Sequence, residues 1–236
     1  MPTQRKKILR KKYRKTKKQM GNETKKIEYP KHPLSPFIKR RDGDKFFLLI
    51  TKDNIHHLDL SDIYIKSFLE KMLSILRISF EREKNYHISL GSYPSNYNHQ
   101  ISTILNFLQN PNYITAVGTD SKLEPQSYLH IEKKQDDFDK MWTVCTDPKS
   151  RGKGFSSYVI SNTLKNQKRN NRKRLLLEVY NDDVIGRHEG DPKQKDIMAH
   201  FLRHGFKQRE RNELSEHTRN GLLSEREETK VMTCNL

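Results

Sequence analysis

The chain has 236 residues, a net charge of +17 at pH 7 and only 33% hydrophobic residues. Its longest apolar run, Phe46–Ile50, is far too short to cross a membrane, and two cysteines are too few for a disulfide framework or a cysteine-bound metal. The first residues contain no apolar segment of the kind that directs secretion. We therefore expect an intracellular protein, cytoplasmic or nuclear, with no membrane segment and no bound metal.

The basic charge is concentrated in the first part of the chain. Residues 1–41 contain sixteen Lys and Arg against two Glu, which leaves a net charge of only +3 for residues 42–236. Because the first segment has few apolar residues, we expect a disordered basic arm, 1–41, followed by one folded domain, 42–236. The run 5–18 is typical of a nuclear localisation signal or of an arm that binds nucleic acid non-specifically, and a purely solubilising tail has the same composition.

Hydrophobic periodicity and turn residues predict the elements of the folded part in chain order. The first half contains a strand at Phe46–Thr51, a helix at Ser61–Phe80 with Ser61 as N-cap, a helix at Tyr97–Asn110, strands at Tyr113–Gly118 and Tyr128–Glu132, and an acidic turn at Gln135–Lys140. The second half contains a strand at Trp142–Thr146, a turn with two glycines, a helix to about Gln167, a strand at Leu175–Tyr180, a helix at Asp196–His204, and strands near Phe206–Glu210 and Lys230–Cys234. The order β-α-α-β-β-β-α-β-α-β-β predicts an α/β fold, of the α+β kind with a mixed sheet.

The turn after the Trp142–Thr146 strand is the most informative segment. It reads Arg151-Gly152-Lys153-Gly154-Phe155-Ser156 and leads directly into a helix. The first turn of a helix has unpaired N–H groups and the positive end of the helix dipole, and glycines allow a phosphate to approach this backbone closely. The spacing fits neither the complete dinucleotide fingerprint nor the P-loop, so the turn predicts a phosphate-bearing ligand of another kind.

This turn resembles the acyl-CoA-binding turn of the GNAT superfamily of N-acetyltransferases, [Q/R]-x-x-G-x-[G/A], with Ser156 in the place of the last small residue. Three neighbouring segments extend the resemblance over residues 142–206. They resemble the fourth strand, the fifth strand and the helix ending in Gly-Phe of that family, and they are Val144–Pro148, Arg174–Asn181 and Asp196–Phe206.

The resemblance implies the GNAT acyltransferase fold and a site for acetyl-CoA between two strands that splay apart. The cofactor-binding residues implied are Val144, Cys145 and Thr146 for the pantetheine arm, Gly152, Lys153, Gly154, Phe155 and Ser156 with Arg151 for the pyrophosphate, and Asn181. The implied reaction is transfer of the acetyl group to a primary amine by direct attack on the thioester, with an acceptor that remains to be identified.

The catalytic groups are less clear because Phe201 occupies the position where many GNAT members carry a tyrosine that protonates the thiolate. The candidates are Tyr180, Glu178 and Asn181 near the end of the fifth strand, and Glu132 and Asp147 are further candidates for the base. Each of these residues also fits an ordinary structural role.

Two other features leave alternatives open. The segment Asp182–Gln194 is longer than the family usually needs, and it fits an acceptor-recognition loop or a tolerated surface insertion. His200 and His204 have the spacing of zinc ligands but lack a third ligand, so we expect them to face solvent. The acidic loops, including Asp136, Asp137 and Asp139, would suit a cationic acceptor.

A second function stays open beside acetyl transfer. The missing tyrosine favours a catalytically degenerate GNAT-like module that binds CoA, or nucleic acid through the arm 1–41, whereas the retained glycine turn favours the enzyme.

Overall fold

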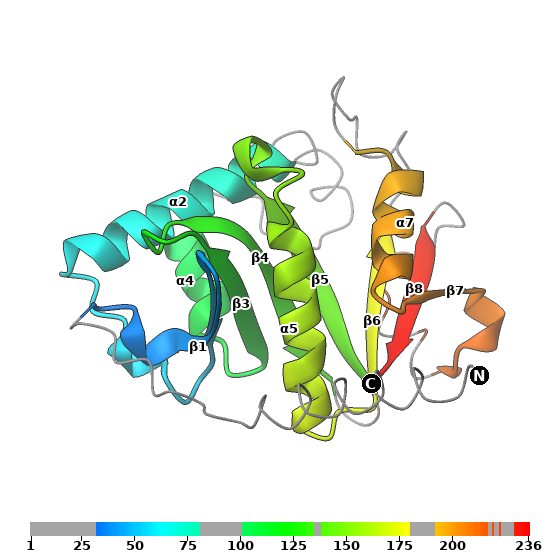
Figure 1. The fold of residues 1–236 in the computed structure, drawn as a ribbon. Helices are drawn as coiled ribbons and strands as arrows, with labels where there is room; N and C mark the ends of the chain where they lie inside the picture. Colours follow the sequence, from blue (N-terminus) through cyan, green and yellow to red (C-terminus); the bar gives the residue numbers. More distant parts are fainter. Residues whose placement is uncertain are drawn as a thin grey trace, which may run out of the picture. The chain divides into compact units, whose positions relative to one another are not determined.

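The computed structural model describes residues 32–80, 101–134, 138–179, 192–216, 219, 222 and 229–236. The chain divides into two units, Met1–His32 and Pro33–Leu236, and the second unit contains the sheet and helices described below (Figure 1). The folded unit therefore begins earlier than the sequence predicts. Strand β1 (Ile38–Asp42) lies within the segment assigned to the basic arm, and this part of the prediction is wrong.

Within the described residues the strands form one eight-stranded mixed sheet with the order β1-β2-β3-β4-β5-β6-β8-β7. The remaining strands are β2 (Lys45–Ile50), β3 (Tyr113–Thr119), β4 (Pro125–Lys133), β5 (Phe138–Thr146), β6 (Arg174–Val179), β7 (Lys207–Arg209) and β8 (Lys230–Asn235). Strands β5 and β6 are parallel, and every other neighbouring pair is antiparallel.

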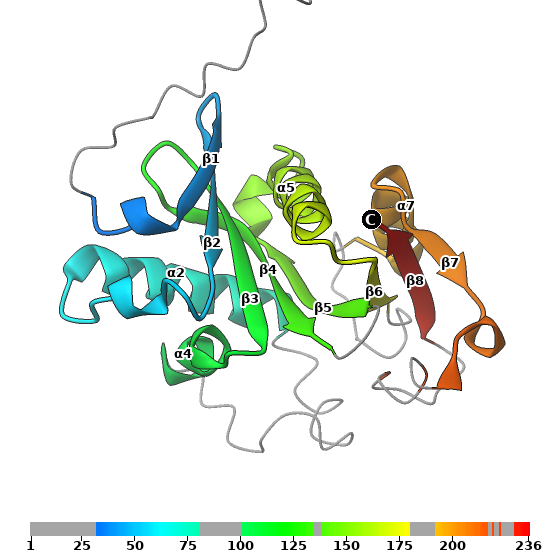
Figure 2. The same cartoon turned by 90° about the horizontal axis from the view of Figure 1, so that it is seen from below.

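Helices cover both faces of the sheet. Helices α5 (Phe155–Arg169) and α7 (Gln194–Arg203) lie side by side on one face, and α2 (Ile63–Phe80) and α4 (Ile101–Gln109) lie on the other (Figure 2). Four short 3-10 turns complete the described elements: η1 (Ser35–Phe37), η2 (Ile55–His57), η3 (Pro148–Ser150) and η4 (Arg211–Glu213). The predicted order of elements is confirmed, with β1 added at its start.

The main core lies between the sheet and the helices α5 and α7. Val159 and Ile160 of α5 pack against buried residues of the central strands, among them Ala116 and Leu129. Helix α5 approaches β3 so closely that a Cβ atom on Gly118 would lie 2.6 Å from the Val159 Cγ2 atom. Glycine at this position lets α5 sit directly on the sheet.

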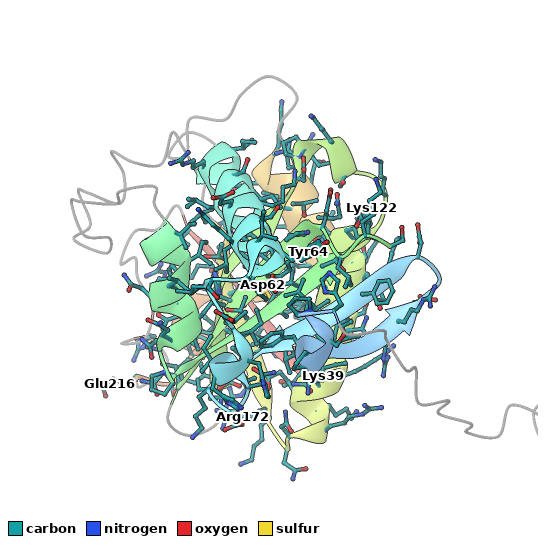
Figure 3. All side chains as sticks on the ribbon, turned by 90° about the vertical axis from the view of Figure 1, so that its left-hand side faces the viewer. Lys39, Asp62, Tyr64, Lys122, Arg172 and Glu216 are labelled. Atoms are coloured by element: carbon teal, nitrogen blue, oxygen red, sulfur yellow. The ribbon has the colours of Figure 1, made fainter. Side chains whose placement is uncertain are left out.

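The N-cap of α2 is Asp62 and not Ser61. The Asp62 Oδ1 atom accepts hydrogen bonds from the N–H groups of Tyr64 at 2.8 Å and Ile65 at 3.2 Å, and Figure 3 shows Asp62 and Tyr64 at the start of this helix. The Ser61 hydroxyl instead donates to Asp59 at 2.7 Å. The carboxylate of Asp59 therefore binds the Ser61 hydroxyl, and Asp62 caps the helix.

The acidic turn predicted at Gln135–Lys140 is wrong for its second half, because β5 already begins at Phe138. Asp139 is fully buried and bound by Arg172, whose Nη2 atom lies 2.6 Å from Asp139 Oδ1. The Asp139 carboxylate can lie buried inside β5 because Arg172 is its charged partner. Asp136 and Asp137 lie outside the described residues.

No helix among the described residues combines the length and the apolar character needed to cross a membrane.

Candidate functional site

The parallel strands β5 and β6 pair only at their beginnings. Within the described part of the chain, the ladder between them joins Phe138–Met141 to Arg174–Leu177 and ends there. Strand β5 continues to Thr146 with β4 alone as its partner, and β6 continues to Val179 paired with β8. A shift in register against β4 makes Trp142 a β-bulge where the ladder ends, and such a bulge bends its strand. The two strands thus part toward their carboxyl ends, as the resemblance implies.

Backbone groups of β5 face the edge from which β6 diverges. The Asp147 N–H group donates to Gln126 O at 2.9 Å, and the Cys145 carbonyl accepts from the Ser127 hydroxyl at 2.8 Å, so both residues point toward β4. Because backbone groups alternate in direction along a strand, those of Val144 and Thr146 point to the opposite edge. The Cys145 side chain is buried.

The glycine turn has the backbone conformation that only glycine adopts easily. Gly152 and Gly154 have φ angles of +76° and +78°, and Gly154 is the N-cap of α5. The first intrahelical hydrogen bond runs from the Tyr158 N–H group to Gly154 O at 3.0 Å. The preceding N–H groups of Phe155, Ser156 and Ser157 therefore have no acceptor within the helix, and they stand at the positive end of its dipole.

Polar contacts brace this turn from β4 and α2. Asp147 accepts a hydrogen bond from the Lys149 N–H group at 3.0 Å and forms an ion pair with Lys71 of α2. The Ser150 hydroxyl bonds to Gln126 of β4. Burial alone would raise the pKa of Asp147, but the bonds from Lys71 and Lys149 outweigh it and hold this pKa below its usual value. Asp147 is therefore an anion that shapes the turn, which leaves little geometric support for its role as a base.

Two side chains that the sequence analysis did not place here meet the first turn of α5. The Lys45 Nζ atom of β2 donates to Lys153 O at 2.7 Å and lies 5.0 Å from the centre of the Phe155 ring. From the other side, the His200 Nε2 atom of α7 lies 3.0 Å from Ser156 Oγ. Both contacts join residues far apart in sequence, so periodicity carries no signal for them.

The prediction that His200 and His204 face solvent is wrong. His200 is half-buried against α5, and His204 lies 3.3 Å from the Ser161 hydroxyl through its Nδ1 atom. Burial, aided by the neighbouring His204 and Arg203, lowers the pKa of His200 to about 4. Arg203 Nη2 lies 3.4 Å from His200 Nδ1. Because Arg203 can only donate, this contact favours the tautomer of the neutral ring that carries its hydrogen on Nε2 and donates to Ser156.

The carboxylates proposed as bases lie on the sheet face opposite α5 and α7. Glu178 is bound to Lys140 at 2.8 Å, and their side chains are only 3% and 2% exposed. Burial lowers the pKa of Lys140, while Glu178 acts to raise it. The Lys140 Nζ atom lies 4.4 Å from the Trp142 ring centre, and the Trp142 indole N–H group donates to Glu132. Non-covalent contacts of Lys140 and Trp142 thus link Glu178 to Glu132 at the point where β5 and β6 separate.

The remaining sequence-predicted residues are placed as follows. Arg151, Gly152, Lys153 and Gly154 are exposed at the turn, Phe155 is buried, and Ser156 is half-buried. Phe201 is buried and packs against Phe206 with ring centres 5.3 Å apart. Tyr180, Asn181 and residues 182–191 of the predicted insertion lie outside the described residues. Among the described His, Cys, Asp and Glu side chains, no group of three or more is arranged to hold a metal ion.

No protein-family model matches the sequence, and a comparison with curated protein sequences gives no match. Solved structures do match the fold. An acetyltransferase from Streptococcus agalactiae has 16% identity and a TM-score of 0.50, and the match covers 72% of this chain and 93% of that one. An acetyltransferase of the GNAT family from Staphylococcus aureus has 10% identity and a TM-score of 0.51, with 81% and 99% covered. Tetrahymena GCN5 has 13% identity and a TM-score of 0.50, with 80% and 94% covered.

The chain has the fold of the GNAT acetyltransferases.

Proposed function

We propose that this protein transfers an acetyl group from acetyl-CoA to a primary amine. The observation that carries the proposal is the position of the glycine turn, which opens α5 at the carboxyl end of β5, beyond the point where β5 and β6 separate. Ligands of α/β sheets bind at such places, outside the carboxyl ends of parallel strands.

The residues present fit an acyl-CoA. The N–H groups from Gly152 to Ser156 would hold the pyrophosphate, and the exposed side chains of Arg151 and Lys153 would add positive charge. The outward-facing backbone of Val144 and Thr146 would bind the amide groups of the pantetheine arm. A backbone N–H group near Thr146 would stabilise the negative charge that develops on the thioester oxygen.

In the proposed reaction the amine nitrogen attacks the thioester carbonyl carbon, the carbon–sulfur bond breaks, and the CoA thiolate leaves. The attacking nitrogen must lose a proton, and the thiolate must gain one. Glu178, which forms an ion pair with Lys140, is the candidate acceptor of the first proton. Tyr180 and Asn181 follow β6 directly in sequence and are the candidates for the second step, since Phe201 has no hydroxyl group.

The phenylalanine at position 201 also favours a second function, that of a CoA-binding module without catalysis. Phe201 is packed into the core, so its position supplies no proton to the thiolate. Release of free CoA thiol from acetyl-CoA in the presence of amines distinguishes the two functions, because the module would bind acetyl-CoA without consuming it.

Binding of acetyl-CoA to the full chain, measured by calorimetry, tests the proposed site. Gly154→Asp places a carboxylate where the pyrophosphate should lie, and its Cβ atom would be 3.4 Å from Lys45 Nζ. We expect the wild type to bind and this variant to lose binding. Gly205→Asp is the matched control, because Gly205 also has a positive φ angle, +85°, but lies after the last turn of α7. Absence of binding by folded wild-type protein overturns the proposal.

A further inference from the structure

Lys45 brings a charge to the glycine turn from a distant part of the chain. It is the first residue of β2 and lies 108 positions before Lys153, whose carbonyl oxygen accepts its hydrogen bond. The Tyr158 hydroxyl of α5 donates to the Lys45 carbonyl at 3.3 Å, so two bonds hold this residue against the helix. The Phe155 ring beneath the Lys45 ammonium group adds a cation–π contact. The position of the ammonium group is therefore defined by its surroundings.

This position adds a fourth cation to a turn that is already basic. A cation near the first turn of a helix is repelled by the positive end of the dipole, and Lys149, Arg151 and Lys153 add like charge in the same turn. The carboxylate of Asp147 is already bound to Lys71. A lysine ammonium group has three donors, and the bond to Lys153 uses one of them. An anion bound at the turn could accept hydrogen bonds from the other two donors.

We infer that Lys45 is a ligand of the acyl-CoA pyrophosphate, one that lies outside the sequence motif. The inference rests on the proposed function and adds a specific residue to it. The ammonium group lies 3.4 Å from where a Cβ atom on Gly154 would be, directly beside the backbone that would hold the phosphates. The β1–β2 hairpin thereby becomes part of the cofactor site, and the motif Arg151–Ser156 forms only one side of it.

The test compares acetyl-CoA binding to full-length Lys45→Gln and Lys39→Gln by calorimetry at one salt concentration. Lys39 is an exposed lysine of β1 in the same hairpin, so its variant loses the same charge away from the turn (Figure 3). We expect Lys45→Gln to weaken binding about tenfold or more, the usual effect of losing a hydrogen bond to a charged group. Lys39→Gln should change it less than about twofold, as screening at distance predicts.

Two further measurements make the result specific. Dephospho-CoA keeps the pyrophosphate but lacks the 3′-phosphate, so Lys45→Gln should weaken its binding by the same factor. Lys45→Arg should keep most of the affinity, which separates loss of charge from damage to the hairpin. The inference is overturned if Lys45→Gln binds acetyl-CoA as well as Lys39→Gln does, or if its defect disappears with dephospho-CoA. In both cases binding by the wild type leaves the proposed function standing, whereas failure of the wild type to bind removes both.

Discussion

Ser156 differs from the glycine or alanine expected at the end of the acyl-CoA turn, and its contact with His200 gives it a role. The half-buried imidazole is neutral at pH 7 because burial, His204 and Arg203 lower its pKa from 6.5 to about 4. The unfolded chain therefore binds a proton between about pH 6.5 and pH 4 that the folded chain does not, so His200 destabilises the fold as the pH falls through this range. His204, whose pKa is also lowered, adds to the same trend.

His200→Gln keeps a hydrogen-bonding group near Ser156 but removes the titration. We expect the variant to lose less stability than the wild type between pH 7.5 and pH 5, by about 1 kcal/mol after allowance for partial exposure. Urea unfolding at both pH values measures this difference. Equal slopes for the two proteins would show that His200 does not titrate as its surroundings require.

At the scale of the elements, the buried carboxylate of Asp139 connects β5 to the segment that precedes β6. Arg172 contacts both Asp139 oxygens, at 2.6 and 3.0 Å, and Gln167 at the end of α5 donates a third bond at 3.1 Å. Asp139→Asn leaves Arg172 without its anionic partner, and we expect a loss of about 3 kcal/mol in the free energy of unfolding. The exposed pair Arg209–Glu213 serves as the control, and Glu213→Gln should cost less than about 0.5 kcal/mol. Similar losses for the two variants, measured by urea unfolding, would contradict the structural role of Asp139.

These elements also show what the sequence can predict. The apolar periodicity of α2 and the short β-branched, apolar run of β3 both come from burial, so they predict their elements directly. Strand β1 is hidden because it is an edge strand whose residues are mostly charged and exposed, which protects the edge but removes the apolar signal. Asp139 looks like part of an acidic turn because its partner Arg172 follows 33 residues later.

The candidate site also has a part that the sequence predicts and a part that it does not. The turn Arg151–Ser156 is local, since its glycines and the following helix are adjacent in sequence, so the sequence alone predicts it. Lys45 and His200 reach this turn only through the packing of β2 and α7 against α5. Contacts of this kind follow from the tertiary structure, so a motif identifies the centre of a site better than its periphery.

At the scale of the whole molecule, the structure moves the start of the folded unit from residue 42 to Pro33. Leu34 and Phe37 are buried, with 1% and 0% of their surface exposed, and β1 pairs with β2 from Ile38 to Asp42. A fragment 33–236 should therefore unfold at the same temperature as the full chain. A fragment 43–236 loses two core side chains and the partner of β2, and we expect it to be less stable by at least about 3 kcal/mol.

Because Lys45 lies at the start of β2, the fragment that lacks β1 should also bind acetyl-CoA more weakly than the fragment 33–236 does. Thermal unfolding and acetyl-CoA titration of the three proteins measure both effects. Equal stability of the two fragments would place the boundary at residue 42 after all, and it would show that the edge strand contributes nothing to the domain that holds the glycine turn.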